Sequence, residues 1–210
     1  MRVYKLINLD STGYLLSEDK VPSIYRDNES PRSITANWHD KKKGHQPDIV
    51  RLYGDWPNMA YSVRVKERLE GSEQAIGEWS EIHVNDDVLW LFHSTLVVDA
   101  LDESLSEFKT LPSGLILPIR VHVFHPDLVP TDRLFMMKTR PYDLLCSDDF
   151  VNTVSEYGWT GFLFEPIWDS NFDPFPVRPY SREFLARPEI YGPDGIVKGY
   201  ENSWPEEWKQ

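Results

Sequence analysis

"SDDFVNTVSEYGWTGFLFEPIW", residues 147–168, contains the clearest helix of the chain and an apolar strand directly after it. Ser147 suits the N-cap of a helix, and the two aspartates that follow complement the positive end of the helix dipole. An apolar stripe comes next, and Gly158 suits the C-terminal cap. The apolar run after this glycine predicts a strand up to Pro166. Helix and strand in immediate succession predict a core shared by both kinds of element.

More strands and a second helix are predicted on the amino-terminal side of this stretch. Residues 2–9 suit an extended segment, and residues 59–71 have apolar side chains at helical spacing before a glycine. Residues 81–98 predict a β-hairpin that turns at an Asn-Asp pair. Residues 115–124 alternate apolar and polar side chains, which predicts a strand with one wet face. The expected fold class is therefore α+β, a mostly antiparallel sheet flanked by a few helices.

Two segments differ from the rest in composition. Residues 10–47 are polar and include a run of three lysines, which favours a long loop or a partly ordered segment. Residues 168–210 contain six prolines and three tryptophans, which indicates an ordered but irregular C-terminal arm packed on the domain or on a partner. We therefore expect a single α+β domain at residues 1–167, followed by this Pro/aromatic-rich arm.

The composition is that of a soluble globular protein. The chain has 210 residues, of which 40% are hydrophobic and 27% charged, enough to bury a substantial core. It has no run of about eighteen uncharged apolar residues, and its first residues lack the apolar stretch of a signal peptide. Cys146 is the only cysteine, so an internal disulfide and a Cys-rich zinc site are excluded. We expect a cytoplasmic protein with no membrane partner.

The negative charge is concentrated in one part of the sequence. The formal net charge is -12, and residues 67–110 carry 11 acidic and 2 basic side chains, net -9. Such a segment repels nucleic acid and attracts a cationic partner. A solvated face that only aids solubility is the alternative interpretation. As partner contacts we predict seven acids and one aromatic anchor: Glu67, Glu70, Glu73, Glu78, Glu81, Asp86 and Asp87, with Trp79 as the anchor.

A second group of acids lies in "VVDALDESLSEFKTLPSG", residues 97–114. Two carboxylates serve general acid-base catalysis only when one holds a proton while the other stays ionised, which requires a cleft. A local role is better supported: Asp99 or Asp102 can accept backbone N–H bonds where a buried strand ends, and we assign both to structure. Glu103 and Glu107 are then one turn apart on a predicted short helix.

No other pattern predicts a catalytic or metal site. His122 and His125 would lie on opposite faces of their predicted strand, so we expect satisfied or exposed histidines there, as for His83 and His93 on the hairpin. Cys146 is expected to be a small buried hydrophobe. Nucleophile-elbow and phosphate-binding glycine motifs are absent from the sequence. We expect no catalytic residue, no metal, no cofactor and no nucleic-acid partner.

Three stretches resemble one known family. They are "VVDALDESLSEF" (97–108), "PSGLILPIRVHVF" (112–124) and "CSDDFVNTVSEYGWTGFLFEPI" (146–167). The Pro-Ser-Gly turn, the Ser-Asp-x-Phe helix start and the Thr-Gly and Phe-Glu pairs resemble immunity family eleven of bacterial polymorphic toxin systems, formerly a domain of unknown function. The resemblance covers about residues 50–167. It implies a protein that binds a cognate toxin encoded beside it, and it implies no catalytic residues.

The resulting hypothesis is a cytoplasmic immunity protein that occludes its toxin stoichiometrically. The acidic segment would meet a basic face of the toxin, such as the substrate cleft of a nuclease. Charge would steer the encounter, and desolvated aromatic anchors would supply the affinity. Two alternatives stay open. One is an unrecognised hydrolase or metal-dependent enzyme, in which His83, His93 or His122 would converge with two acids, and the other is a structural component of a secretion system.

Overall fold

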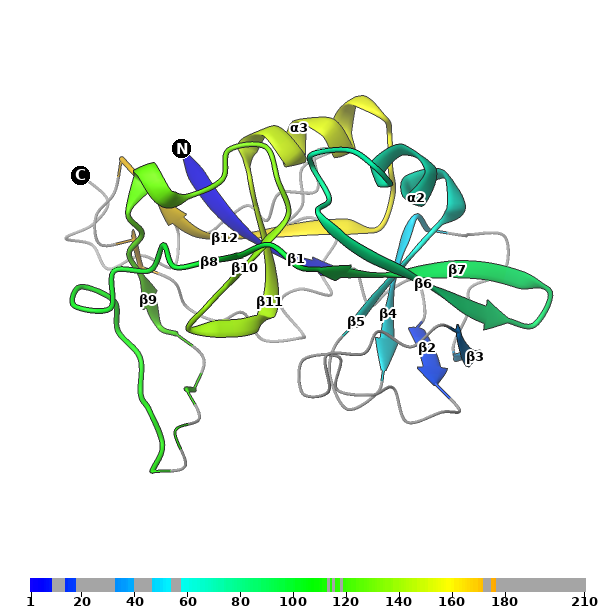
Figure 1. Cartoon of the computed structure of the whole chain (residues 1–210), viewed down its shortest axis with the longest axis horizontal. Coiled ribbons are helices and arrows are strands. Elements are labelled where there is room, and N and C mark those ends of the chain that lie inside the picture. The colour runs from blue at the N-terminus through cyan, green and yellow to red at the C-terminus, as the bar shows by residue number, and fades with distance from the viewer. Residues whose placement is uncertain are drawn as a thin grey trace.

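The chain forms two β-structures side by side, with a helix packed over each of them (Figure 1). One is an open sheet and the other is a closed barrel. The expected α+β class with mostly antiparallel pairing is confirmed, but the strands form these two units and a small two-stranded ladder rather than one sheet. None of the helices in the described part of the chain is long and apolar enough to cross a membrane. The computed structural model describes residues 1–8, 14–17, 33–39, 47–53, 58–112, 114, 116–117, 119–171 and 175–176.

The open sheet has five strands in the order β12-β1-β11-β10-β8. Neighbours are antiparallel except for β8 and β10. The prediction of a strand at residues 2–9 is confirmed, and this strand lies inside the sheet, between β11 and β12. The strands are β1 (Arg2–Asn8), β8 (Val97–Val98), β10 (Phe135–Met137), β11 (Arg140–Ser147) and β12 (Phe162–Asp169).

Strand β12 continues three residues beyond its expected end at Pro166. Its pairing with β1 changes register, so that Tyr4 lies opposite Pro166 and Val3 lies opposite Trp168. Such a bulge interrupts the regular ladder beside the proline, which has no N–H to donate, and lets the strand continue.

The closed barrel has six strands in the order β2-β3-β6-β7-β5-β4. The predicted hairpin is confirmed as β6 and β7, and its turn contains Asn85 with a φ of 55°. The barrel encloses an apolar core of its own, which includes Leu15, Ile34, Leu52, Ile82 and Leu89. The strands are β2 (Tyr14–Ser17), β3 (Ser33–His39), β4 (Ile49–Tyr53), β5 (Asn58–Tyr61), β6 (Gly77–Val84) and β7 (Asp87–Ser94).

Strands β2 and β3 contradict the loop predicted at residues 10–47. In β3, Ile34 and Ala36 are buried and alternate with exposed residues. This alternation is short and lies in polar surroundings, so only pairing with the distant β6 and with β2 reveals it as a strand. The run of three lysines lies outside the described residues.

Helices α2 (Val63–Leu69) and α3 (Asp148–Glu156) help to enclose a central core between the sheet and the barrel. The helix predicted at residues 59–71 begins only at Val63, because Met59 and its neighbours pair with β4 as strand β5. Buried side chains of both units meet in the central core, which includes Tyr4, Leu6, Tyr61, Leu69, Phe92, Phe150 and Phe162.

Helix α3 begins and ends as the sequence predicts. Ser147 occupies its N-cap position, although its hydroxyl donates to the Thr131 carbonyl instead of capping the helix. Phe150 and Val154 are buried on one face. Gly158 has a φ of 59°, which is the left-handed conformation expected at a C-terminal cap.

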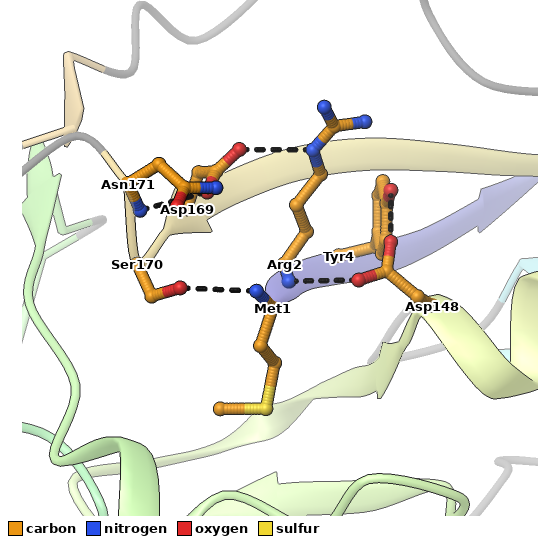
Figure 2. A network of polar contacts seen from close by, with 7 residues as sticks. All are labelled: Met1, Arg2, Tyr4, Asp148, Asp169, Ser170 and Asn171. Carbon is orange, nitrogen blue, oxygen red and sulfur yellow. Dashed lines mark hydrogen bonds and ion pairs between the residues drawn. The ribbon is translucent and has the colours of Figure 1, made fainter.

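Asp148 at the start of α3 also fastens strand β1 (Figure 2). Its two oxygens accept hydrogen bonds from the Arg2 backbone N–H at 3.0 Å and from the Tyr4 hydroxyl at 2.8 Å. Arg2 Nε donates in turn to Asp169 at the end of β12, at 2.9 Å. One carboxylate predicted only to complement the helix dipole therefore joins the helix to the sheet.

The segment between β8 and β10 covers the other face of the sheet. Its buried residues form an outer core with the sheet, which includes Val3, Leu101, Phe124, Leu145 and Trp168. The strand predicted at residues 115–124 is reduced to β9 (Val121–His122), which pairs with β13 (Phe175–Pro176). The segment also contains the 3-10 helix η2 (Pro126–Leu128).

Two predictions for this segment fail, one of them in part. The expected wet face is present only at Arg120, which is exposed, because His122 is buried like Val123. The short helix expected to carry Glu103 and Glu107 is a series of turns and isolated bridges, in which Glu107 pairs with Val121. Packing against a distant sheet, rather than local periodicity, determines the conformation here.

Candidate partner-binding surface

The eight predicted contact residues come from helix α2, the loop after it and the β6–β7 hairpin. Helix α2 packs on β7, so these elements are neighbours in space as well as in sequence (Figure 1). Val65 and Leu69 turn inward to the central core, which leaves Glu67 on the outer face of the helix. Gly71, with a φ of 74°, follows the helix and directs the chain back toward β6.

Asp48 holds the start of α2 in place. Its buried side chain accepts hydrogen bonds from Ser62 Oγ at 2.7 Å, from the Thr160 backbone N–H at 2.8 Å and from Arg64. Burial alone would raise the pKa of Asp48, but the hydrogen bonds from Arg64, Thr160 and Ser62 outweigh it and lower that pKa. Helix α2 is thereby attached to the residues that link α3 to β12.

Ion pairs reduce the charge of two predicted contact residues. Lys66 Nζ lies 2.5 Å from a Glu70 oxygen, and Arg133 Nη2 lies 3.0 Å from a Glu73 oxygen. Both cations lie outside residues 67–110, so the charge count for that segment overestimates the negative field at the surface.

Three predicted acids are exposed and form no ion pair with any residue that the structure describes: Glu67, Glu78 and Asp86. Glu81 is half-buried and lies 3.2 Å from His83 Nε2, and Asp87 is half-buried at the start of β7. The unpaired acids among the predicted contacts therefore lie on α2 and on the hairpin.

Trp79 is half-buried and already packs on aromatic side chains of the chain itself. Its ring lies 5.7 Å from Tyr61 and 4.7 Å from Phe92, measured between ring centroids, and it packs against the central core. Much of its surface is therefore used for folding. Its role as the partner anchor stays a prediction.

The second group of acids lies beside the five-stranded sheet, away from the hairpin. Asp102 Oδ1 accepts hydrogen bonds from the backbone N–H groups of Ser104 and Leu105 at 2.9 and 3.2 Å, which confirms its capping role. Hydrogen bonding from Ser104 lowers the pKa of Asp102. Asp99 instead forms an exposed ion pair with Lys138 at 2.6 Å. The acidic segment thus contributes to two separate surfaces.

A half-buried ionic cluster on the outer-core face of the sheet was not predicted from the sequence. Asp143 accepts from Lys5 Nζ at 2.6 Å and from Arg140 Nε at 2.7 Å. Burial would raise the pKa of Asp143, but Lys5 and Arg140 outweigh it and lower that pKa. Glu165 lies opposite Lys5 in the ladder, and burial raises its pKa. The available signal was the presence of charged residues within apolar strands.

His122 adjoins this cluster with its Nδ1 atom buried and without a hydrogen-bond partner among the described residues. Burial lowers the pKa of His122 to about 4, and Lys5 and Arg140 act in the same direction while Asp143 opposes them. The expectation of a satisfied or exposed histidine is therefore wrong at this position and correct for His125, which is exposed.

The histidines that an enzyme would require to converge lie on three strands. His83 and His93 belong to the barrel strands β6 and β7, whereas His122 lies in β9 beside the open sheet. Within the described part of the chain, no group of three or more His, Cys, Asp or Glu side chains is placed to hold a metal ion. Cys146 is fully buried, as predicted, and burial raises the pKa of its thiol.

Comparison with known proteins identifies the family. The model of the Imm11 immunity protein family matches residues 14–169, which extends further toward the amino terminus than the resemblance at residues 50–167. The matched span begins at β2 and ends at the last residue of β12, so it includes the whole barrel and most of the open sheet. The comparison with curated proteins found no match. Because the family match covers well over half of the chain, this protein belongs to the Imm11 family of immunity proteins.

Proposed function

We propose that this chain binds a cognate bacterial toxin and neutralises it by stoichiometric occlusion, with no bond made or broken. The observation that carries the proposal is membership of the immunity family over residues 14–169. An immunity protein acts on the toxin that would otherwise poison its own cell, so its partner is a protein. The cytoplasm, where such a toxin would meet its target, is the proposed location.

The proposed contact surface is the acidic side of α2 and the β6–β7 hairpin. Support comes from Glu67, Glu78 and Asp86, which are exposed there with no ion pair in the described part of the chain. Such charges speed the encounter with a basic protein and make its rate dependent on salt. A basic face on the toxin, with the acids of this chain against it, is the partner chemistry that we propose.

The proposed organisation is a single domain at residues 1–167 and a C-terminal arm at residues 168–210 that packs on the domain or on the toxin. Of the arm, only residues 168–171 and 175–176 are described. Pro176 and Trp168 are described, and the other prolines and tryptophans of the arm lie outside the described residues. A variant of this chain without residues 177–210 would show which of the two surfaces the arm contacts. Loss of toxin binding would indicate the toxin, and loss of stability without loss of binding would indicate the domain.

The proposed function is tested with the toxin encoded in the adjacent reading frame. Co-expression should rescue cells from that toxin, and the purified pair should form a complex of fixed stoichiometry. The double variant Glu67→Lys/Asp86→Lys should slow association at least tenfold at low salt, with a smaller effect at high salt.

A matched control makes the same charge change elsewhere. Glu107→Lys/Asp127→Lys reverses two exposed acids beside the open sheet and should leave the association rate nearly unchanged. Equal rates for both double variants would contradict the proposed surface. Failure of the unmodified chain to rescue cells or to bind would contradict the function itself.

A further inference from the structure

The outer face of strand β7 has an apolar row that the chain covers only in part. Phe92, Trp90 and Val88 alternate along the strand and therefore point to the same face. Phe92 belongs to the central core and is 7% exposed, Trp90 is half-buried, and Val88 is 42% exposed. A strand with one wet face normally has polar residues on that face, so the continuation of the apolar row past the core needs an explanation.

The neighbours of this row join it into one continuous surface. In the β6–β7 ladder Glu81 lies opposite Trp90 and His83 lies opposite Val88, on the same face. Lys66 Nζ lies 4.3 Å from the centroid of the Trp90 ring. We call this surface the hairpin strip, and it consists of Lys66, Glu70, Glu81, His83, Val88 and Trp90.

The apolar centre of the hairpin strip, formed by Val88 and Trp90, is surrounded by net negative charge. Lys66 is paired with Glu70 at 2.5 Å and is held over the Trp90 ring, so its charge is already balanced. Glu81 remains beside the centre, and the exposed Glu67 on α2 and Asp86 at the hairpin turn contribute further negative charge. A partner that fits has an apolar side chain surrounded by lysines or arginines.

The Trp90 ring is also preorganised for binding. Lys66 lies over the ring, and Trp90 is fixed in the β6–β7 ladder, so the rotamers of Trp90 are restricted before any partner binds. Ordering a flexible side chain opposes association, and a ring that is already ordered avoids most of that cost. Tryptophan is among the residues that most often dominate interface energies.

We propose that the hairpin strip is the anchor for the basic face of the toxin, with Val88 and Trp90 as its apolar contacts. The proposal rests on the proposed function and refines it, because it moves the anchor from Trp79, whose ring packs on Tyr61 and Phe92, to two residues further along the same face. Charge steers the toxin to this side, and the apolar centre holds it.

The test compares one substitution at two matched positions. Val88→Arg places a bulky cation in the centre of the strip, against a basic partner. Val97→Arg makes the same change in β8 of the open sheet, where the valine is 48% exposed compared with 42% for Val88. The dissociation constant is measured with a catalytically inactive form of the toxin from the adjacent reading frame.

Val88→Arg should weaken binding at least tenfold, and Val97→Arg should change it less than twofold. Unchanged thermal unfolding of both variants would show that they fold, and Val88→Ser supplies a second variant with a smaller change. Equal affinities for the two arginine variants, with binding by the unmodified chain intact, would overturn the strip but leave the proposed function standing. If the unmodified chain does not bind the toxin, the proposed function fails.

A second copy of this chain is the rival occupant of the strip. Sedimentation of the chain without toxin distinguishes the two occupants. A self-interface would make the unmodified chain a dimer and the Val88→Arg variant a monomer. That result would overturn the toxin as the occupant. A monomer whose toxin affinity falls only in the Val88 variant would support it.

Discussion

At the scale of the residue, the half-buried ionic cluster shows how a charge in an apolar strand is accommodated. Lys5 in β1 and Arg140 in β11 both pair with Asp143, so none of the three charges is left alone in the outer-core face of the sheet. Removing one member of a buried pair leaves an uncompensated charge and typically costs about 3–5 kcal/mol. Lys5 and Arg140 keep partial exposure, which reduces this cost.

His122 should make the stability of the protein depend on pH between about 6.5 and 4. Its pKa is lowered from 6.5 to about 4 by burial, so as the pH falls the unfolded chain takes up this proton before the folded chain does. The free energy of unfolding should therefore fall across that window, by at most about 1.4 kcal/mol per pH unit. Above pH 6.5 this histidine should contribute no pH dependence.

The measurement is urea unfolding of His122→Gln at a series of pH values. The variant should lose the part of the slope that lies between pH 6.5 and 4, because glutamine does not titrate. His83→Gln is the control for replacing an exposed histidine, since the His83 side chain is 47% exposed. A slope in His122→Gln equal to that of the unmodified protein would contradict the buried neutral histidine.

At the scale of the element, the link between α3 and β12 depends on one glycine. Gly161 has a φ of 86°, and a Cβ atom at this position would lie 2.8 Å from the Ile49 carbonyl oxygen at the start of β4. The neighbouring Thr160 carbonyl accepts a hydrogen bond from the Asp48 N–H at 2.9 Å. The link is therefore held against β4 so closely that a side chain has no room.

Gly161→Ala should lower the free energy of unfolding by about 2–4 kcal/mol, because it adds both backbone strain and a clash with main chain. Gly158→Ala is the matched control: its φ of 59° also strains an alanine, but no atom lies within 4 Å of the added Cβ. We expect a cost of about 1 kcal/mol there. Chemical denaturation measures both, and equal costs would contradict the clash with β4.

At the scale of the whole molecule, the central core joins the sheet to the barrel. The Phe162 ring of β12 lies 6.2 Å from the Tyr61 ring of β5 and 6.5 Å from the Phe150 ring of α3, between ring centroids. All three side chains are buried in the same cluster. Because the sheet and the barrel share the buried side chains at this junction, they should unfold together in one cooperative transition.

Phe162→Ala should lower the free energy of unfolding by about 3–5 kcal/mol, since it leaves a cavity in the central core. Tryptophan fluorescence and far-ultraviolet circular dichroism should still give coincident transitions in urea. Leu128→Ala is the control, because Leu128 is 54% exposed and should have little effect. Two separated transitions would show that the sheet and the barrel unfold independently.

The sequence alone determined the elements whose signals are local. Helix α3 is defined by its N-cap, acidic first turn and C-terminal glycine, and the hairpin by two apolar runs around Asn85. The fully buried Cys146 and the capping role of Asp102 were also predictable, because each depends on nearby residues. The resemblance over about residues 50–167 pointed to the family that the wider comparison then confirmed.

Only the tertiary structure decided the features that depend on distant partners. Closure of the barrel pairs β2 with β4 and β3 with β6, and Glu73 loses free charge to the distant Arg133. Likewise, nothing in the local pattern showed that the Trp79 ring packs on Tyr61 and Phe92, whereas the Trp90 ring lies beside Lys66. Periodicity and turn chemistry act over a few residues, whereas burial and ion pairing depend on which surfaces the folded chain brings together.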